Sequence, residues 1–236
     1  MATSIPYEPK TVALLVIDST SEMCVRCIFI CFTKFTYKWK EVLEVDFDFN
    51  VLIDMQESLR KEVIDIIPNV KSIVKTCHEK DIPVFWTQHG HRNLKFDGGA
   101  VGRWWGDGSI KWGSDEWKIL RELQPIISRS STSIDVLDFV IKNKTRYDAF
   151  YRTELGSILT SLGIETLIIS GAETNLCCEA TARSGFDQDY NIVFLKDATV
   201  TENEEMHKAT LLNLEYGVAK IATVTEVIEW LDKRVN

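Results

Sequence analysis

The chain has 236 residues, of which 45% are apolar and 26% are charged, and its formal net charge at pH 7 is −8. This length and composition fit one α/β domain with a full-sized core and exclude a disordered chain. The acidic balance argues against a nucleic-acid partner, because phosphate binding needs a concentrated basic face.

The sequence predicts neither a membrane span nor a disulfide framework. No apolar run approaches the roughly 20 residues that cross a bilayer, and Met1 to Lys10 lack the apolar core of a signal peptide. We therefore expect a cytoplasmic protein with reduced thiols and no membrane partner. The pair Cys24 and Cys27 stands alone, without the second pair that would complete a zinc site.

Two segments near the start read as the same structural element. Thr11 to Asp18 and Phe49 to Asp54 are both strand-like runs that end in an Ile-Asp pair. Removing residues 19–54 would join the first run directly to Met55, so we expect a single domain over residues 1–236 with an insertion at about 19–54. The inserted piece has no clear strand or helix period, and we interpret it as an alternative exon or a translated intervening sequence.

Strands and helices alternate through the rest of the chain. Helical spacing of apolar residues predicts a helix over 63–74, and 82–87 reads as the next strand. The stretch 88–111 is expected to be irregular because of its glycines. Further strands are expected at 136–141, 166–170, 191–195 and 219–222, and further helices at 153–162, 174–184 and 202–216. This alternation predicts a doubly wound, Rossmann-like, mostly parallel sheet flanked by helices.

Cys177 stands out because it follows a buried strand and a tight turn, near the start of a helix. The free backbone N–H groups and the dipole at such a position favour the thiolate. The thiolate is the form that attacks a carbonyl carbon, so Cys177 is a candidate nucleophile. The alternative is a small apolar residue on the inner face of a helix.

Three motifs, in one order along the chain, carry a family resemblance: Leu52-Ile53-Asp54-Met55-Gln56, then Lys144-Thr145-Arg146-Tyr147-Asp148-Ala149-Phe150, then Thr174-x-x-Cys177-x-x-x-Thr181-Ala182-Arg183. Over about residues 51–231 the chain resembles the isochorismatase-like cysteine hydrolases, and within that family it most resembles the plant-type nicotinamidases. The resemblance implies the isochorismatase-like hydrolase fold. It also implies an amidase that converts nicotinamide to nicotinate and ammonia through a thioester.

The resemblance further implies a role for each motif. Asp54 corresponds to the base that takes the thiol proton, Lys144 to the orienting cation and Cys177 to the nucleophile. The Ala172-Glu173 peptide bond corresponds to a cis peptide, and the backbone N–H groups of Glu173 and Cys177 correspond to oxyanion donors. The physical chemistry agrees, because a carboxylate and an ammonium beside a thiol can pass its proton to a leaving amine.

Each of the three catalytic positions has a competitor close by in the sequence. The competitors are Asp18, Lys142 and Cys178. Asp18 ends the other strand-like run, but it lacks the Met-Gln pair that follows Asp54. The position of Arg146 to Phe150 likewise favours Lys144 over Lys142, and the spacing from Thr174 favours Cys177 over Cys178.

Aromatic and histidine side chains are candidates for substrate or metal binding. Trp104, Trp105, Trp112 and Phe96 could stack on a flat substrate ring, although they could equally anchor the loop, and Phe150 is a further candidate for substrate binding. The resemblance implies a divalent metal, zinc or iron, near His89 and His91. Residues at i and i+2 of an extended segment share one side, so these two histidines could share a metal. The sequence offers no clear third histidine ligand, and we therefore expect no required cofactor. His91 could contact the substrate instead.

Two further functions compete with nicotinamide hydrolysis. The same residues could hydrolyse another small amide or carbamate of the ureido type. Alternatively, the insertion could leave a catalytically weak isoform that acts as a binding protein. We expect a small-molecule amide as the partner and, from the resemblance, a homo-oligomer.

Overall fold

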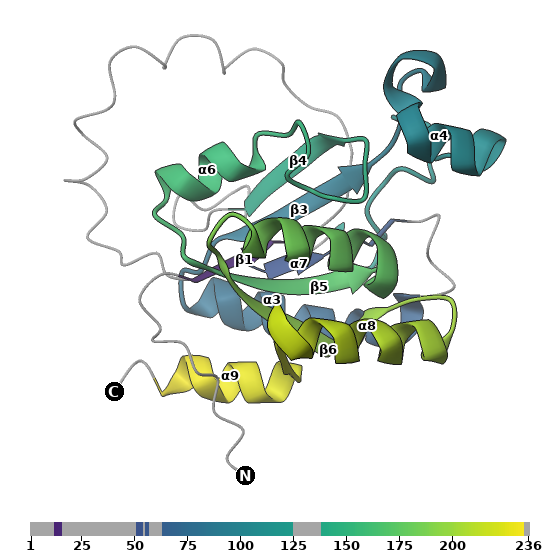
Figure 1. The fold of residues 1–236 in the computed structure, drawn as a ribbon. Coiled ribbons are helices and arrows are strands. Elements are labelled where there is room, and N and C mark those ends of the chain that lie inside the picture. The colour runs from purple at the N-terminus through teal and green to yellow at the C-terminus, as the bar shows by residue number, and fades with distance from the viewer. Residues whose placement is uncertain (1–11, 16–50, 54, 57–62, 125–137, 234–236) are drawn as a thin grey trace, which may run out of the picture.

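The computed structural model describes residues 12–15, 51–53, 55–56, 63–124 and 138–233. The strands there are β1 (Val12–Leu15), β2 (Val51–Ile53), β3 (Val84–His89), β4 (Asp138–Lys144), β5 (Thr166–Ala172), β6 (Asn191–Val200) and β7 (Lys220–Ala222). The helices are η2 (Ile64–Ile66), α3 (Ile67–Glu79), η3 (Leu94–Gly98), α4 (Gly99–Trp105), η4 (Gly106–Gly108), α6 (Leu155–Ser161), η5 (Thr174–Cys178), α7 (Glu179–Phe186), α8 (Glu204–Gly217) and α9 (Val224–Asp232). The predicted α/β alternation is confirmed (Figure 1).

The described strands form one sheet in which every strand pairing is parallel. Across the sheet, β4 pairs with β3, and β5 to β7 follow one another on the far side of β1 and β2. Chain order therefore reverses next to β5, and such a switch point opens a crevice at the carboxyl ends of the strands.

β1 and β2 pair with the same residues of their neighbours. Leu14 and Val51 are both in register with Val84 of β3 and with Ile168 of β5. Neighbouring strands lie about 4.8 Å apart, so the space between β3 and β5 accommodates one strand. The pairing thus assigns the two strand-like runs to one position in the sheet. The rest of the expected insertion lies outside the described residues.

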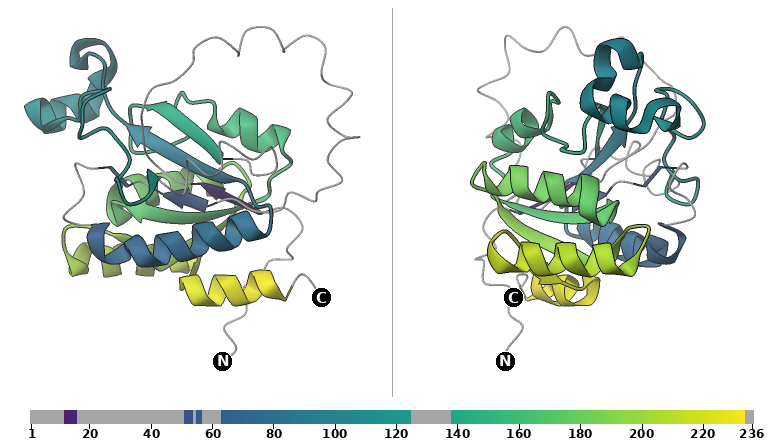
Figure 2. Two further views of the ribbon diagram at one scale, coloured as in Figure 1. Left: turned by 180° about the vertical axis from the view of Figure 1, so that it is seen from behind. Right: turned by 45° about the vertical axis from the view of Figure 1, so that its right-hand side comes forward.

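Helices cover both faces of the sheet (Figures 1 and 2). On one face, apolar residues of α3 and α9 such as Val70 and Val227 join a buried cluster with Val84 and Ile168. On the other face, residues of α6, α7 and α8 such as Leu159 and Leu214 form a second cluster. Burial of β3, β5 and β6 on both faces explains why these strands read as nearly continuous apolar runs.

Local sequence signals account for the helix starts. Asn203 caps α8 by accepting from the Met206 N–H at 2.9 Å. α9 begins with a capping box in which the side chains and backbones of Thr223 and Glu226 bond reciprocally. Both caps satisfy backbone donors that have no partner inside the helix.

The glycine-rich stretch forms an arm that projects from the body of the domain (Figures 1 and 2). The expectation that it is too rich in glycine for a helix is wrong, because it contains α4. Gly99 and Gly106, both with a φ of +54°, bracket this helix, and Gly102 lets it approach Leu94 closely. Among the described residues, no helix is long and apolar enough to cross a membrane.

Candidate active site

The central contact of the candidate site joins two side chains that lie far apart in the sequence. The Nζ atom of Lys144 lies 3.1 Å from the Sγ atom of Cys177. Lys144 is fully buried, whereas Cys177 is half-buried and so remains partly accessible to solvent. An ammonium at this distance stabilises a thiolate more than a thiol.

The two residues converge because parallel strands end at one edge of the sheet. Lys144 is the last residue of β4 and is in register with His89, the last residue of β3. Cys177 lies beyond the end of β5, on the far side of β3 and the shared strand position. The long lysine side chain therefore reaches across the carboxyl edge to the thiol.

The turn between β5 and η5 is shaped by its backbone. Gly171 has a φ of +118°, and the Ala172–Glu173 peptide bond is cis, the geometry that the resemblance implies. The carbonyl oxygen of Glu173 accepts hydrogen bonds from the N–H groups of Leu176 and Cys178, both at 3.1 Å. These bonds close the first turn of the helix that carries the thiol.

The structure separates the lysine and cysteine candidates from their sequence neighbours. Lys142 is exposed at the surface, whereas Lys144 is buried. Cys178 is buried in the apolar cluster beneath α6 and α7, and its Sγ lies 4.0 Å from the Ser170 carbonyl oxygen. Of these four residues, only Lys144 and Cys177 combine a buried cation with a partly exposed thiol.

Asp54 and Asp18 lie outside the described residues, but the two residues after Asp54 are described. Met55 is fully buried in the cluster under α3. Gln56 is also buried, and its Nε2 donates to the His89 carbonyl oxygen at 2.7 Å. This bond connects the segment after β2 to the end of β3.

His89 and His91 lie side by side at the end of β3. Their rings form an edge-to-face pair with centroids 5.0 Å apart, and His91 Nδ1 lies 3.4 Å from Asp97 Oδ1. Burial lowers the pKa of both rings, and the Lys144 ammonium lowers that of His89 further. Both imidazoles are therefore neutral near pH 7.

The described part of the chain does not supply a metal site. No three His, Cys, Asp or Glu side chains among the described residues gather closely enough to hold an ion. A protein-bound zinc needs at least three protein ligands, and His89 and His91 provide two. The described residues thus do not fit a resident metal, and no step below is routed through one.

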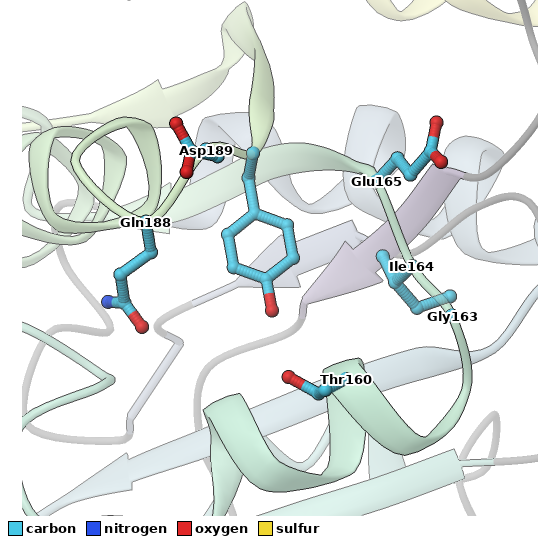
Figure 3. Close-up of a pocket in the computed structure, with 7 residues that line it drawn as sticks. Thr160, Gly163, Ile164, Glu165, Gln188 and Asp189 are labelled. Atoms are coloured by element: carbon cyan, nitrogen blue, oxygen red, sulfur yellow. The ribbon is translucent and has the colours of Figure 1, made fainter.

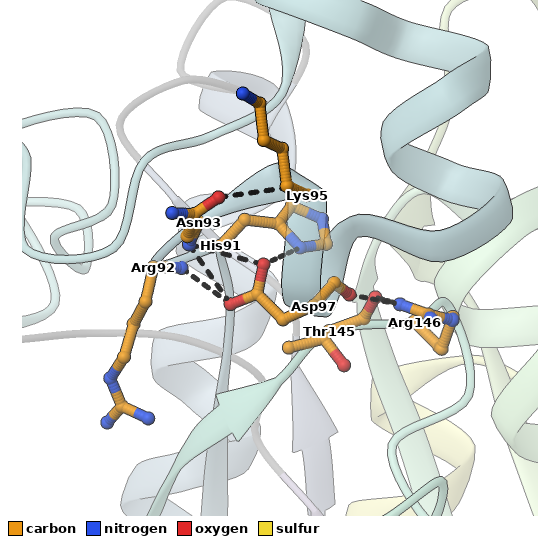
Figure 4. Close-up of polar contacts among 7 residues, drawn as sticks. All are labelled: His91, Arg92, Asn93, Lys95, Asp97, Thr145 and Arg146. Carbon is orange, nitrogen blue, oxygen red and sulfur yellow. Dashed lines mark hydrogen bonds and ion pairs between the residues drawn. The ribbon is translucent and has the colours of Figure 1, made fainter.

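A polar network ties the arm to the residues that follow β4 (Figure 4). The Asp97 carboxylate accepts from the Arg92 N–H at 2.7 Å and faces His91. The Arg146 guanidinium donates to the carbonyl oxygens of Asp97 at 2.8 Å and of Thr145 at 2.6 Å. The network holds the arm beside the reactive edge of the sheet.

The predicted substrate-binding aromatic residues lie in different surroundings. Trp104 is 81% exposed on the arm. The Trp105 indole N–H donates to the Tyr147 hydroxyl at 2.8 Å and so helps to anchor the arm. Phe150 stacks on Tyr190 with ring centroids 5.8 Å apart, so its described contacts are with the core.

One open pocket lies away from this edge (Figure 3). It has a volume of about 310 Å³, and its lining includes Thr160, Glu165 and Tyr190. Glu165 directly precedes β5 and Tyr190 directly precedes β6, so the pocket lies at the amino edge of the sheet. It is thus separate from the Cys177 thiol, and its lining contains no cysteine.

One contact of the site has no signal in the sequence. His207 of α8 bonds to Thr174, which starts the helical segment bearing the thiol. The two residues are 33 positions apart, and nothing in their spacing or neighbours indicates that α8 docks there. Only the packing of α8 on η5 brings them together.

Comparisons with known proteins agree with this architecture. Residues 49–226 match the family model of the isochorismatase domain. Nicotinamidase 3 of Arabidopsis thaliana is 35% identical over 169 residues, which cover 72% of this chain and 81% of that protein. The ureidoacrylate amidohydrolase RutB of Enterobacter sp. (strain 638) is 32% identical over 174 residues, or 68% of this chain and 73% of that protein. A cysteine hydrolase from Pseudomonas syringae pv. phaseolicola superimposes with a TM-score of 0.70 at 18% identity, covering 98% of this chain and 96% of that one.

Proposed function

The chain belongs to the isochorismatase family and is a C–N hydrolase of a small amide, and from that premise we propose that it converts nicotinamide to nicotinate and ammonia. The observation that carries the proposal is the 3.1 Å contact between Lys144 Nζ and Cys177 Sγ. The relative named Nicotinamidase 3 supports the choice of substrate.

In the first half of the reaction, the Cys177 thiolate attacks the amide carbon. The Lys144 ammonium favours the thiolate, and Asp54 accepts the thiol proton. The tetrahedral oxyanion takes hydrogen bonds from the backbone N–H groups of Cys177 and Glu173. When the C–N bond breaks, Asp54 returns the proton to the departing nitrogen, which leaves as ammonia, and a thioester remains on the sulfur.

In the second half, water attacks the carbonyl carbon of the thioester. Asp54 accepts a proton from the water, the same donors hold the second oxyanion, and the C–S bond breaks. Asp54 returns the first proton of the water to the Cys177 sulfur, the second proton passes from the new carboxyl group to solvent, and nicotinate is released. Atoms and charges balance over the cycle without any oxidant or reductant.

The sequence motif favours Asp54 over Asp18 as the base. Asp54 is followed by Met55-Gln56, as in the family motif, whereas Asp18 is followed by Ser19-Thr20. The Gln56 side chain donates to the His89 carbonyl oxygen at 2.7 Å, so the segment that follows Asp54 contacts the end of β3.

A second candidate substrate is a ureido amide. The 32% identical relative named ureidoacrylate amidohydrolase favours it. The thiolate would again attack a carbonyl carbon, and a thiocarbamate would take the place of the thioester because a second nitrogen stays on that carbon. The two candidates differ in the shape of the acyl group, and an aromatic ring distinguishes nicotinamide from a ureido chain.

The test is ammonia release from nicotinamide and from ureidoacrylate by the purified full chain and two variants. Cys177→Ala should abolish release, whereas Cys178→Ala is the matched control, because it removes a neighbouring thiol that packs in the core. Intact-protein mass spectrometry during turnover should detect the acyl adduct in the unsubstituted protein and in Cys178→Ala, but not in Cys177→Ala. Equal activity of Cys177→Ala would contradict the mechanism, and release from ureidoacrylate alone would reassign the substrate.

A further inference from the structure

Thr174 lies three residues before the nucleophile, and its side chain is fully buried. Its Oγ1 lies 2.9 Å from Nδ1 of His207, a half-buried residue in the first turns of α8. α8 packs directly on η5, and Figure 1 shows it beside the end of the sheet where η5 begins. The contact therefore joins the turn that bears the thiol to a helix that contributes no reacting group.

The direction of the bond follows from the second nitrogen of the ring. His207 Nε2 lies 3.1 Å from the carbonyl oxygen of Lys196, and a carbonyl oxygen can only accept. Nε2 therefore carries the hydrogen, and in a neutral imidazole Nδ1 is then an acceptor. The Thr174 hydroxyl must donate to Nδ1, so a single chain of hydrogen bonds runs from Thr174 through the ring to the backbone of β6.

The surroundings keep the ring neutral. Burial is the main effect, and it lowers the pKa of His207. Among the neighbouring charges, Glu204 raises this pKa and Lys208 lowers it, and the bond to the Lys196 carbonyl also raises it. The net shift is downward, which preserves the acceptor nitrogen for Thr174 near pH 7.

Further contacts bind the same turn on both sides of the thiol. The Thr201 hydroxyl, just after β6, donates to Asn175 Oδ1 at 2.6 Å. The Thr210 hydroxyl of α8 donates to Glu179 Oε2 at 2.8 Å. The segment carrying the nucleophile is thus attached before and after Cys177, and the His207 bond is the attachment closest to the cis turn.

We propose that His207 is a positioning residue, which fixes the Thr174 hydroxyl and thereby holds the Cys177 thiol at its 3.1 Å distance from Lys144. The inference rests on the proposed function of Cys177 as the nucleophile. Small displacements of a reacting group have large kinetic effects, of the order of a hundredfold for about 1 Å. The ring acts through Thr174 and touches neither the substrate nor the reacting atoms.

The experiment compares His207→Ala, Thr174→Val, the double variant and Thr174→Ser. His207→Ala and Thr174→Val should each lower kcat by about 10- to 100-fold with little change in KM, because geometry in the reacting state is lost rather than ground-state binding. The double variant should be no slower than the slower single variant, because both remove one bond. Thr174→Ser keeps the hydroxyl and should stay within about threefold of the unsubstituted protein.

Two controls keep the result interpretable. Glu205→Gln changes a residue that is exposed on the same helix and does not act on the His207 ring, and it should leave kcat unchanged. The rate of Cys177 alkylation by iodoacetamide, read by peptide mass spectrometry, needs no substrate and should fall in the same variants. If nicotinamide is not a substrate but alkylation falls as expected, the proposed function fails while the positioning role stands.

Other outcomes would overturn the proposal. One is a normal kcat and alkylation rate in His207→Ala. Another is full additivity of the His207→Ala and Thr174→Val losses, which would mean that the two side chains act independently. If His207→Ala does not fold, the near-isosteric Thr174→Val carries the test, and unchanged kinetics in that folded variant would be equally decisive.

Discussion

Replacement of Lys144 by methionine tests the electrostatic core of the site. Methionine has a similar length and no charge, so it can occupy the buried position while removing the ammonium beside Cys177. We expect the pH at which half of the Cys177 thiol is ionised to rise. The reason is that the thiolate loses its nearest opposite charge.

The size of the rise follows from the distance. Two unit charges 3.1 Å apart attract by about 5 kcal/mol at an effective dielectric constant of about 20. Water and nearby dipoles replace part of this interaction, and opposite charges at such distances typically shift a titration by about one to three units. Since one unit is about 1.4 kcal/mol, we expect the midpoint to rise by one to three units.

The assay is the pH dependence of iodoacetamide alkylation, followed at Cys177 by peptide mass spectrometry. Tryptic cleavage after Arg152 and Arg183 leaves Cys177 in a peptide shared only with Cys178, and fragmentation separates the two thiols. At pH values below both midpoints, the alkylation rate should fall about tenfold to a thousandfold. Thermal unfolding of each variant shows whether the fold is retained.

Lys142→Met is the matched control, because it removes the same charge from the same strand at an exposed position. It should leave the alkylation midpoint unchanged. A folded Lys144→Met variant with an unchanged midpoint would refute the reasoning, as would an equal shift in Lys142→Met. The first result would mean that the ammonium does not act on the thiol, and the second that the effect is long-range.

Three further predictions concern stability. Gly99→Ala should lower the free energy of unfolding in urea by about 1–2 kcal/mol, and by more than Gly106→Ala does. Both glycines have a φ of +54°, but only at position 99 would the added Cβ displace the Arg146 guanidinium. Equal losses in the two variants would contradict this contact. Deleting residues 19–54 should preserve cooperative thermal unfolding, because β1 and β2 share one position in the sheet. Loss of the unfolding transition would show that the fold needs both strand-like segments. The free energy of unfolding should fall as the pH drops below about 6.5, because the unfolded chain protonates His207 while burial lowers the pKa of this ring in the folded chain. His207→Gln should reduce the pH dependence of the free energy of unfolding by up to about 1.4 kcal/mol per pH unit. An unchanged pH dependence in this variant would count against the buried neutral ring.

The arm shows where sequence reasoning about the fold fails. Glycine is unfavourable inside a helix, which is why the stretch 88–111 is expected to be irregular. In the structure, Gly99 and Gly106 bracket α4, and Gly102 allows close contact with Leu94. The glycines therefore permit a short helix whose stability comes from packing, a contribution that local propensity does not contain.

The lysine and cysteine pairs show a similar limit at the site. From the sequence alone, the register of Arg146 to Phe150 favours Lys144 over Lys142, and the spacing from Thr174 favours Cys177 over Cys178, but neither signal shows where the side chains lie. Burial distinguishes the lysines, and the direction of the first helical turn after β5 distinguishes the cysteines. Both differences depend on neighbouring strands and helices that are distant in the sequence.

The sequence by itself determined the alternation of strands and helices, the parallel sheet and the motifs that meet at its carboxyl edge. These follow from periodicity and residue order, which are local properties of the chain. Only the tertiary structure decided that Lys144 reaches Cys177, that β1 and β2 share one position, and that His207 holds Thr174. Such contacts join residues tens of positions apart, and they form only when helices and strands pack together, because burial and hydrogen bonding then act between segments that have no local relation.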